Sequence, residues 1–263
     1  MHQTRARQAL TIARPHPRDA AAEGFAEIEA FTALLADLTE EEWGRPTTSA
    51  GWTVHDMVAH VVGQHVESAR PWTIPGKIKQ ARRRFAGRST LDAHNALQIA
   101  EHGTRTPDEL RGLLERFGPK AVRVRLRAPG FLRRRSVARM FPEESLPDSS
   151  FAYLFDVLST RDTWLHRLEI ARATDRPFVT GDHDRGVVTQ VVRDLAEEWS
   201  GPPITLEFGG GRWELGEGEP VAVVRADPLD YLWHLSGREG SPALDIEGDP
   251  AVAGAVLDAR VVF

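Results

Sequence analysis

Three polar residues interrupt the apolar face of one predicted helix, and their chemistry suits a metal ion. At about 100° per residue, the apolar stripe of a helix over 151–170 consists of Phe151, Phe155, Leu158 and Leu165. Asp162, His166 and Glu169 fall on that same stripe. A carboxylate or an imidazole inside an apolar face is costly unless it is paired or binds a metal. Because Asp162 and His166 are four residues apart, both can point at one ion. The pattern predicts a metal site inside a helical bundle, with a buried metal-free ion pair as the alternative.

An earlier segment offers another imidazole. Thr53 and Asp56 have the spacing of a capping box, which predicts a helix starting at Thr53. His60 lies at the edge of its apolar face, about 60° beyond Met57. There it can face a cleft between helices as a ligand, or be a histidine at the boundary of the core. We expect Asp56 to cap the helix rather than to act as a catalytic base.

The composition narrows the possible chemistry. The 263 residues include no cysteine, which excludes disulfides, thiolate ligands and a cysteine nucleophile. Any metal must be held by His, Asp or Glu, and any thiol must come from outside the chain. The net charge of −5 argues against a general nucleic-acid binder. Because neither a membrane span nor a secretory signal is recognisable, we expect a soluble, cytoplasmic protein without membrane or nucleic-acid partners. The oligomeric state is left open.

The first part of the chain predicts a four-helix bundle. The helical regions are expected over 18–41, from Thr53 onwards, from Leu91 to about Phe117 with an interruption near Gly103, and from about Asp148 or Ser149 to before Pro177. The stretches 70–90 and 118–147 are rich in Pro, Gly and Arg and are expected to be irregular connections.

The last 80 or so residues predict a small α+β unit. Strands are expected over 204–208, 212–215, 221–226 and 243–246, and helices over 184–199, 228–235 and 250–258. The glycine run 209–211 joins two strands and opens no helix, so it is a hairpin turn and not a phosphate loop. The predicted domains are a flexible N-terminus (1–17), a helical bundle (18–178) and an α+β domain (183–263).

Two of these segments resemble a known family. The run Trp52–His60 is similar to the W-T-V-x-D-x-x-x-H segment of DinB-like metal-binding domains. The run Asp162–Ile170 resembles the second ligand segment of the mycothiol-dependent maleylpyruvate isomerase family. The resemblance covers most of the chain. It implies a DinB-like four-helix metal-binding bundle followed by a sterol-carrier-like α+β domain.

What the resemblance implies is a divalent metal, usually zinc, held by His60, Asp162 and His166. It also implies mycothiol or another low-molecular-weight thiol as cofactor, and a small, anionic electrophile as substrate. The family's characterised reaction is cis–trans isomerisation of maleylpyruvate, and relatives with this bundle are S-transferases. Arg238 best matches an arginine implicated in the isomerase. The isomerase has Glu where this chain has the shorter Asp162, which puts the isomerase substrate in doubt.

Several other side chains have more than one expected role. Glu169 is expected either to accept a hydrogen bond from a ligand imidazole or to pair with an arginine. Together with Asp56, the residues His65 and Asn95 are candidates for supporting or pocket positions. The arginine runs 82–84 and 133–135 are expected on a solvated surface, with substrate binding as the alternative. The resulting function is a metal- and thiol-dependent isomerase or S-transferase. The rival is a non-catalytic small-ligand-binding or regulatory protein on the same scaffold, and a nucleic-acid role ranks third.

Overall fold

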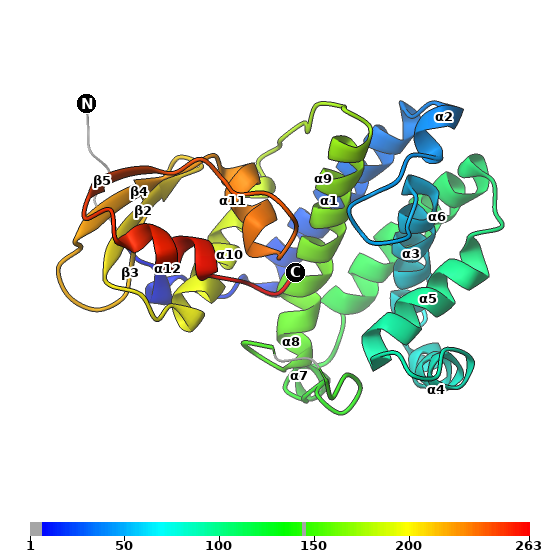
Figure 1. The fold of residues 1–263 in the computed structure, drawn as a ribbon. Coiled ribbons are helices and arrows are strands. Elements are labelled where there is room, and N and C mark those ends of the chain that lie inside the picture. Colours follow the sequence, from blue (N-terminus) through cyan, green and yellow to red (C-terminus); the bar gives the residue numbers. More distant parts are fainter. Residues whose placement is uncertain (1–6, 144–145) are drawn as a thin grey trace. The chain divides into compact units, whose positions relative to one another are not determined.

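The computed structural model describes residues 7–143 and 146–263, and these divide into two compact units (Figure 1). The helical unit is Pro15–His183, and the sheet unit combines the described residues up to Arg14 with Asp184–Phe263. A helical part followed by a small sheet with its own helices confirms the predicted fold class. Within the described residues, none of the helices has the length and apolar character needed to cross a membrane.

Among its described residues, the helical unit contains six helices of 11–20 residues and five shorter helical segments. Its elements are α1 (Pro17–Ala36), α2 (Glu40–Trp43), α3 (Val54–Ser68), η2 (Pro71–Thr73), α4 (Ile74–Arg84), α5 (Thr90–His102), α6 (Pro107–Leu126), α7 (Gly130–Arg133), α8 (Phe151–Tyr153), η3 (Leu154–Leu158) and α9 (Ser159–Ala173). Helix α1 packs on α6 and α9, and α3 packs on α6, α5 and α9. The core between them is formed by fully buried side chains such as Phe31, Leu35, Met57 and Leu114.

Two glycines let α1 and α6 approach closely. A Cβ atom on Gly118 would lie 2.8 Å from Cγ2 of Ile28, and one on Gly24 would lie 3.2 Å from Cγ2 of Val122. A side chain at Gly118 would therefore push the two helices apart, because protein interiors are already close-packed.

Two stretches expected to be irregular are partly helical, so those expectations were wrong. Helix α4 occupies most of 70–90; it starts with Pro75 in its first turn, ends on Arg82–Arg84 and buries only Ile78 and Ala81. Proline in the first turn and basic residues in the last favour a helix, but two buried positions give little apolar periodicity.

Helix α6 also continues past its expected end near Phe117 to Leu126, with Pro119 inside it. Proline costs a helix roughly 3 kcal/mol, yet the fully buried Leu110, Leu114 and Ala121 hold this helix in the core. The first predicted helix (18–41) is in turn divided into α1 and the short α2, whose capping box starts at Thr39.

The stretch from Phe151 to Ala173 is one continuous helical path with a π-helical segment. Ser150 caps its start, and the backbone is π-helical over Leu154–Leu158 before α9 begins at Ser159. A π-helical turn holds more residues than an α-helical turn, and such segments often occur at functional sites. The segment changes the register just ahead of Asp162.

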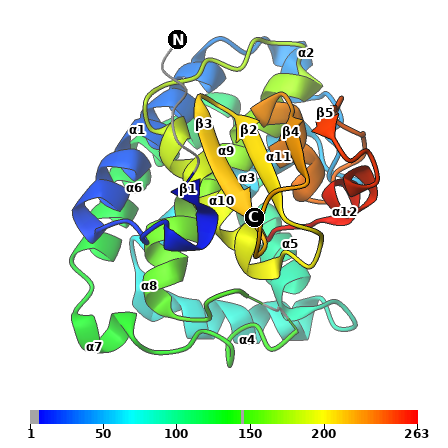
Figure 2. The ribbon, with the colours of Figure 1, turned by 90° about the vertical axis from the view of Figure 1, so that its left-hand side faces the viewer.

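The sheet unit is built on five strands in the order β1-β3-β2-β4-β5 (Figure 2). Its elements are β1 (Arg7–Gln8), η1 (Ala9–Thr11), α10 (Asp184–Glu198), β2 (Ile204–Phe208), β3 (Gly211–Leu215), β4 (Ala222–Arg225), α11 (Pro228–Leu235), β5 (Asp245–Gly248) and α12 (Val252–Asp258). Strands β2 and β3 form an antiparallel hairpin, β4 runs parallel to β2, and β5 pairs antiparallel with β4. Asp227 caps α11 through the backbone N–H groups of Leu229 and Asp230.

The N-terminal stretch differs from the expected flexible segment over 1–17. Arg7 and Gln8 pair in parallel with Trp213 and Glu214 of β3, and Ala9 is fully buried. Arg14 donates to Asp194 on α10 at 2.6 Å. Residues 1–6 lie outside the described part of the chain. A stretch with no apolar periodicity of its own is thus ordered by pairing with a strand some 200 residues away in the sequence.

Candidate metal centre

The three predicted metal ligands come together inside the helical unit. His60 lies on α3, and Asp162 and His166 lie one turn apart on α9, which packs against α3. One ligand atom from each side chain lies within 4.8 Å of the other two. His60 and His166 are buried, and the Asp162 side chain is 24% exposed. The cluster is therefore enclosed by the bundle but reachable from one side.

The orientation of His60 is fixed by a chain of polar side chains from α5 and α3. His60 Nδ1 lies 2.8 Å from Gln98 Oε1, and Gln98 Nε2 donates to Glu67 Oε2 at 2.9 Å. Since the Gln98 amide is oriented by Glu67, its oxygen accepts a hydrogen from His60 Nδ1. That tautomer leaves Nε2 of His60 with a free lone pair.

Gly63 allows this chain to form. A Cβ atom at Gly63 would lie 2.7 Å from Cβ of Gln98 and 3.2 Å from Cδ2 of His102. The missing side chain lets α5 approach α3 closely, which brings the Gln98 amide within reach of His60. Gly63 thus permits a short distance between α3 and α5, and this distance lets Gln98 fix the orientation of the His60 ring.

On α9, Asp162 and His166 are also held from outside the cluster. Gln64 Nε2 donates to Asp162 Oδ2 at 2.8 Å, while Asp162 Oδ1 lies 3.6 Å from His166 Nε2. His166 Nδ1 lies 3.7 Å from Glu169 Oε2. The other Glu169 oxygen accepts from Thr48 Oγ1, the Ser49 backbone N–H and Ser49 Oγ, at 2.7–2.9 Å. Glu169 is thus anchored to the loop before α3 and lies behind the His166 ring.

The charges of the cluster follow from burial and from one another. Burial lowers the pKa of His60 to about 4, and the neighbouring His166 adds to this effect. Burial acts to raise the pKa of Asp162, but His166 and His60 hold it well below its usual range. Burial also acts against a charged His166, yet Asp162 and Glu169 raise its pKa to about 9. Without a metal, the cluster is a neutral His60 beside an imidazolium–carboxylate pair.

The donor set fits a divalent metal. Two imidazole nitrogens and one carboxylate oxygen are the ligands of many catalytic zinc sites, which keep further positions open. Each donor has a partner on its outer side, as metal ligands usually do. His166 Nε2 and Asp162 Oδ1 lie 3.6 Å apart without a hydrogen bond between them, a separation at which one ion could contact both atoms.

Comparison with known proteins assigns the family. Residues 24–171 match the family model "Mycothiol maleylpyruvate isomerase N-terminal domain". The chain belongs to this family. The matched range contains His60, Asp162, His166 and Glu169, and ends before Arg238.

Two solved structures have the same fold as this member of the mycothiol maleylpyruvate isomerase family. A crystal structure of the mycothiol-dependent maleylpyruvate isomerase superposes with a TM-score of 0.59 and 16% identity, over 89% of this chain and 95% of that chain. A histidine-to-alanine mutant of that isomerase gives a TM-score of 0.57 and 14% identity, over 90% and 97%.

Two curated proteins of Mycobacterium tuberculosis match a short stretch of this family member. Uncharacterized protein MT0763 (strain CDC 1551 / Oshkosh) and Uncharacterized protein Rv0738 (strain ATCC 25618 / H37Rv) are each 40% identical over 42 residues. The match spans 16% of this chain and 23% of each relative's length.

The other predicted site residues lie around the cluster or away from it. Asp56 accepts from the backbone N–H and hydroxyl of Thr53 and so caps α3. His65 is buried, with Nε2 3.2 Å from Thr163 Oγ1, and burial together with Arg125 lowers its pKa to about 3. Asn95 is half-buried on α5. Arg238 belongs to the sheet unit, where it donates to Ser236 Oγ and lies over the Trp233 ring.

Three side chains that hold the cluster were not predicted from the sequence. They are Gln64, Glu67 and Gln98. A signal was present, because His94, Gln98 and His102 recur every four residues and are all buried on one face of α5. His94 Nε2 lies 2.8 Å from Glu67 Oε2, so His94 contacts the same carboxylate that orients Gln98.

Proposed function

We propose that this chain is a metal-dependent enzyme that uses a low-molecular-weight thiol, of the mycothiol type, to isomerise or conjugate a small anionic electrophile. The observation that carries the proposal is the convergence of His60, Asp162 and His166, each held from its outer side. Membership of the mycothiol maleylpyruvate isomerase family supports the choice of thiol and reaction class.

His60, Asp162 and His166 would hold the metal, and zinc suits this donor set. When bound, the metal supplies a Lewis acid that lowers the pKa of a thiol, so that the thiol becomes a nucleophile towards a conjugated double bond. Because the chain contains no cysteine, that thiol has to be a separate molecule.

The chain's own residues orient the ligands and exclude water. Gln98 keeps the Nδ1 proton on His60, and Gln64 leaves Asp162 one oxygen for the ion. Glu169 lies behind His166, where it favours the Nδ1–H tautomer. The Trp52 ring lies 5.3 Å from the His60 ring and covers it with an apolar surface. Arg238 remains the proposed partner for the negative charge of the substrate, on the family resemblance.

Metal content is the first test. We expect close to one equivalent of metal in the purified parent by elemental analysis, and little in Asp162→Ala and His166→Ala. His55→Ala is the matched control, because His55 lies on α3 and contacts the Arg105 carbonyl instead of the cluster. If the parent stays metal-free after incubation with zinc, the cluster is a buried ion pair and the proposal fails.

Activity is the second test. The zinc-loaded parent is expected to isomerise maleylpyruvate only when mycothiol is present, or to consume mycothiol with an electrophile from a panel of unsaturated acids. His166→Ala should lose that activity. A parent that binds zinc stoichiometrically but neither isomerises nor conjugates with any thiol tested would contradict the enzymatic role and favour a non-catalytic ligand-binding protein.

A further inference from the structure

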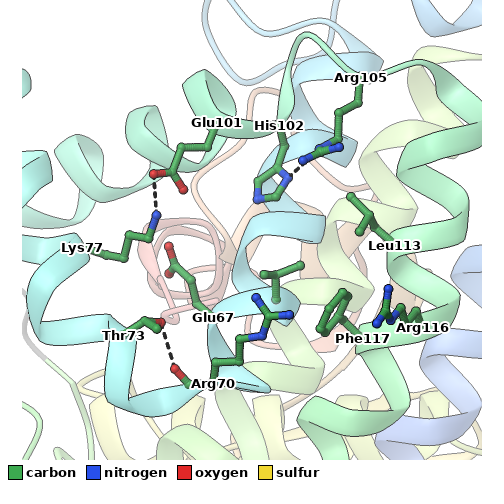
Figure 3. Close-up of a pocket in the computed structure, with 11 residues that line it drawn as sticks. Glu67, Arg70, Thr73, Lys77, Glu101, His102, Arg105, Leu113, Arg116 and Phe117 are labelled. Carbon is green, nitrogen blue, oxygen red and sulfur yellow. Dashed lines mark hydrogen bonds and ion pairs between the residues drawn. The ribbon is translucent and has the colours of Figure 1, made fainter.

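A cavity lies in the helical unit beside Glu67, the carboxylate that accepts a hydrogen bond from Gln98. It has a volume of about 400 Å³ and lies among α3, α4, α5 and α6 (Figure 3). Figure 3 shows Glu67 and Lys77 on one side of it, Leu113 and Phe117 on the opposite side, and His102 above Arg70. A cavity of this size suits a small molecule.

Cationic groups dominate its lining. Lys77 is paired with Glu101 across the cavity's edge. Arg70, Arg105 and Arg116 also line the cavity, and within the described residues none of the three forms an ion pair with a carboxylate. The guanidiniums of Arg70 and Arg116 lie 4.8 and 5.2 Å from the centre of the Phe117 ring, and Arg105 Nε donates to His102 Nδ1. These three guanidiniums are held by a ring and an imidazole. Their other N–H groups can therefore form charge-assisted hydrogen bonds to an anion.

One carboxylate faces this positive charge. Glu67 lines the cavity and is 5% exposed. Its Oε2 atom accepts from Gln98, but its Oε1 atom is buried without a hydrogen-bond partner. An unpaired buried acceptor is costly, roughly 1–3 kcal/mol, so a donor that reaches Oε1 would recover this free energy.

The remaining wall is apolar. The Phe117 ring is buried at 6% exposure, with Leu113 beside it in Figure 3. A ligand that fills the space between this wall and Glu67 needs an apolar or aromatic part at one end and polar groups at the other.

From this arrangement we propose that the cavity binds a small amphoteric molecule of the amino-acid type: an anionic carboxylate held by Arg70 and Arg105, an ammonium or hydroxyl donor held by Glu67, and an apolar side chain against Phe117. The site is separate from the metal cluster, and its occupation does not depend on the proposed enzymatic activity. The volume of the cavity suits one small molecule better than a peptide or a nucleic acid strand.

Three matched probes test the assignment on the full chain by isothermal titration calorimetry. L-Phenylalanine carries all three features, 3-phenylpropionate lacks the ammonium group, and 2-phenylethylamine lacks the carboxylate. We expect L-phenylalanine to bind saturably, and each of the other two to bind at least about tenfold more weakly, since a charge-assisted hydrogen bond contributes about 1.5–3 kcal/mol.

Variants assign each contact. Arg70→Ala and Arg105→Ala should weaken L-phenylalanine binding at least about tenfold. Arg123→Ala is the matched control, because Arg123 also lies on an aromatic ring, Phe25, but does not line the cavity. Glu67→Gln should remove the preference for L-phenylalanine over 3-phenylpropionate, a ratio that partial unfolding would not change.

The proposal is overturned if none of the probes binds saturably, if 3-phenylpropionate binds as tightly as L-phenylalanine, or if Arg70→Ala and Arg105→Ala bind like Arg123→Ala. Zinc content is measured on the same protein samples. A loss of L-phenylalanine binding can therefore be distinguished from a failure of the proposed metal site.

Discussion

His166 and Arg167 are consecutive residues of α9, yet they enter two very different buried polar clusters of the helical unit. His166 joins His60 and Asp162. Arg167 donates from Nε and Nη2 to the two oxygens of Glu27, at 2.8 and 3.0 Å. His183 Nε2 lies 3.0 Å from Glu27, and the Arg167 guanidinium lies 4.0 Å from the centre of the Phe178 ring. Both clusters combine a carboxylate with histidine, but only one contains a guanidinium.

The difference shows what makes a buried cluster a metal site. In the Glu27 cluster, a bidentate arginine already supplies the positive charge and fills both carboxylate oxygens. In the His60 cluster, Asp162 contacts the amide of Gln64 and the imidazole of His166, and neither group is permanently charged. The first cluster contains a permanent cation, whereas in the second the positive charge is a proton on His166 that a metal ion could replace.

Removing the Arg167 guanidinium from the Glu27 cluster should cause the largest change in the free energy of unfolding. Arg167→Ala leaves the Glu27 carboxylate, which is 1% exposed, without its bidentate partner. We expect the free energy of unfolding to fall by roughly 3–5 kcal/mol, measured by urea unfolding of the metal-free protein. Arg127→Ala, on the exposed end of α6, should change it by no more than about 0.5 kcal/mol. A similarly small loss for Arg167→Ala would mean that the two clusters do not differ as described.

Adding zinc, which we expect to bind at the His60 cluster, should cause the next largest change in the free energy of unfolding. Zinc at about 100 times its dissociation constant should raise the free energy of unfolding of the parent by about 2.7 kcal/mol. The same increment is expected in Arg167→Ala, because this substitution leaves His60, Asp162 and His166 in place. His166→Ala should show no increment. Thermal unfolding with zinc and with a chelator measures all three, and an increment in His166→Ala would place the ion elsewhere.

Removing the Gln98 side chain, which orients His60, should weaken zinc binding without abolishing it. Gln98→Ala deprives His60 Nδ1 of its acceptor and frees the imidazole to turn. Zinc affinity is expected to fall about 10–100-fold, as for other groups behind metal ligands, when measured by competition with a chromophoric chelator. Gln80→Ala is a suitable control, because Gln80 is exposed on α4. Equal affinities would show that the Glu67–Gln98–His60 chain does not orient the ligand.

The smallest effect is expected from an ion pair at the edge of the bundle. The Arg176 guanidinium and the Thr39 backbone N–H lower the pKa of Glu42 to about 2. A depressed carboxyl pKa adds stability at neutral pH that is lost as the pH falls through the range from about 4.5 to about 2. Melting temperatures of Glu42→Gln should therefore depend less on pH in this range than those of the parent. Parallel curves for the two proteins would contradict the assignment.

The sequence predicted the clustering of the proposed ligands better than it predicted the side chains that support them. Asp162 and His166 could be found because they share one helix, where spacing alone places them on one face. The strand positions of β2 and β3 and the Asp227 cap of α11 likewise follow from local patterns. These features depend on residues at most a few positions apart.

The supports depend on contacts between distant segments. Gln98 reaches His60 because Gly63 allows close packing of α3 and α5. The residue pattern of one helix does not reveal how closely it packs on another. Helix α4 has too few buried positions to produce a periodic signal, and Arg7–Gln8 forms a strand only because β3 is present beside it. Proline at position 119 pointed to an irregular end of α6, but tertiary packing outweighed its local preference.

The π-helical segment Leu154–Leu158 has a consequence for changes in chain length. Its turn accommodates more residues than a turn of α-helix, so a one-residue insertion or deletion ahead of Asp162 can be absorbed there. In an unbroken α-helix the same change would rotate everything before it by about 100° relative to the ligands. The segment can thus keep the spacing of Asp162 and His166 independent of changes in the length of the Arg- and Pro-rich stretch that precedes it.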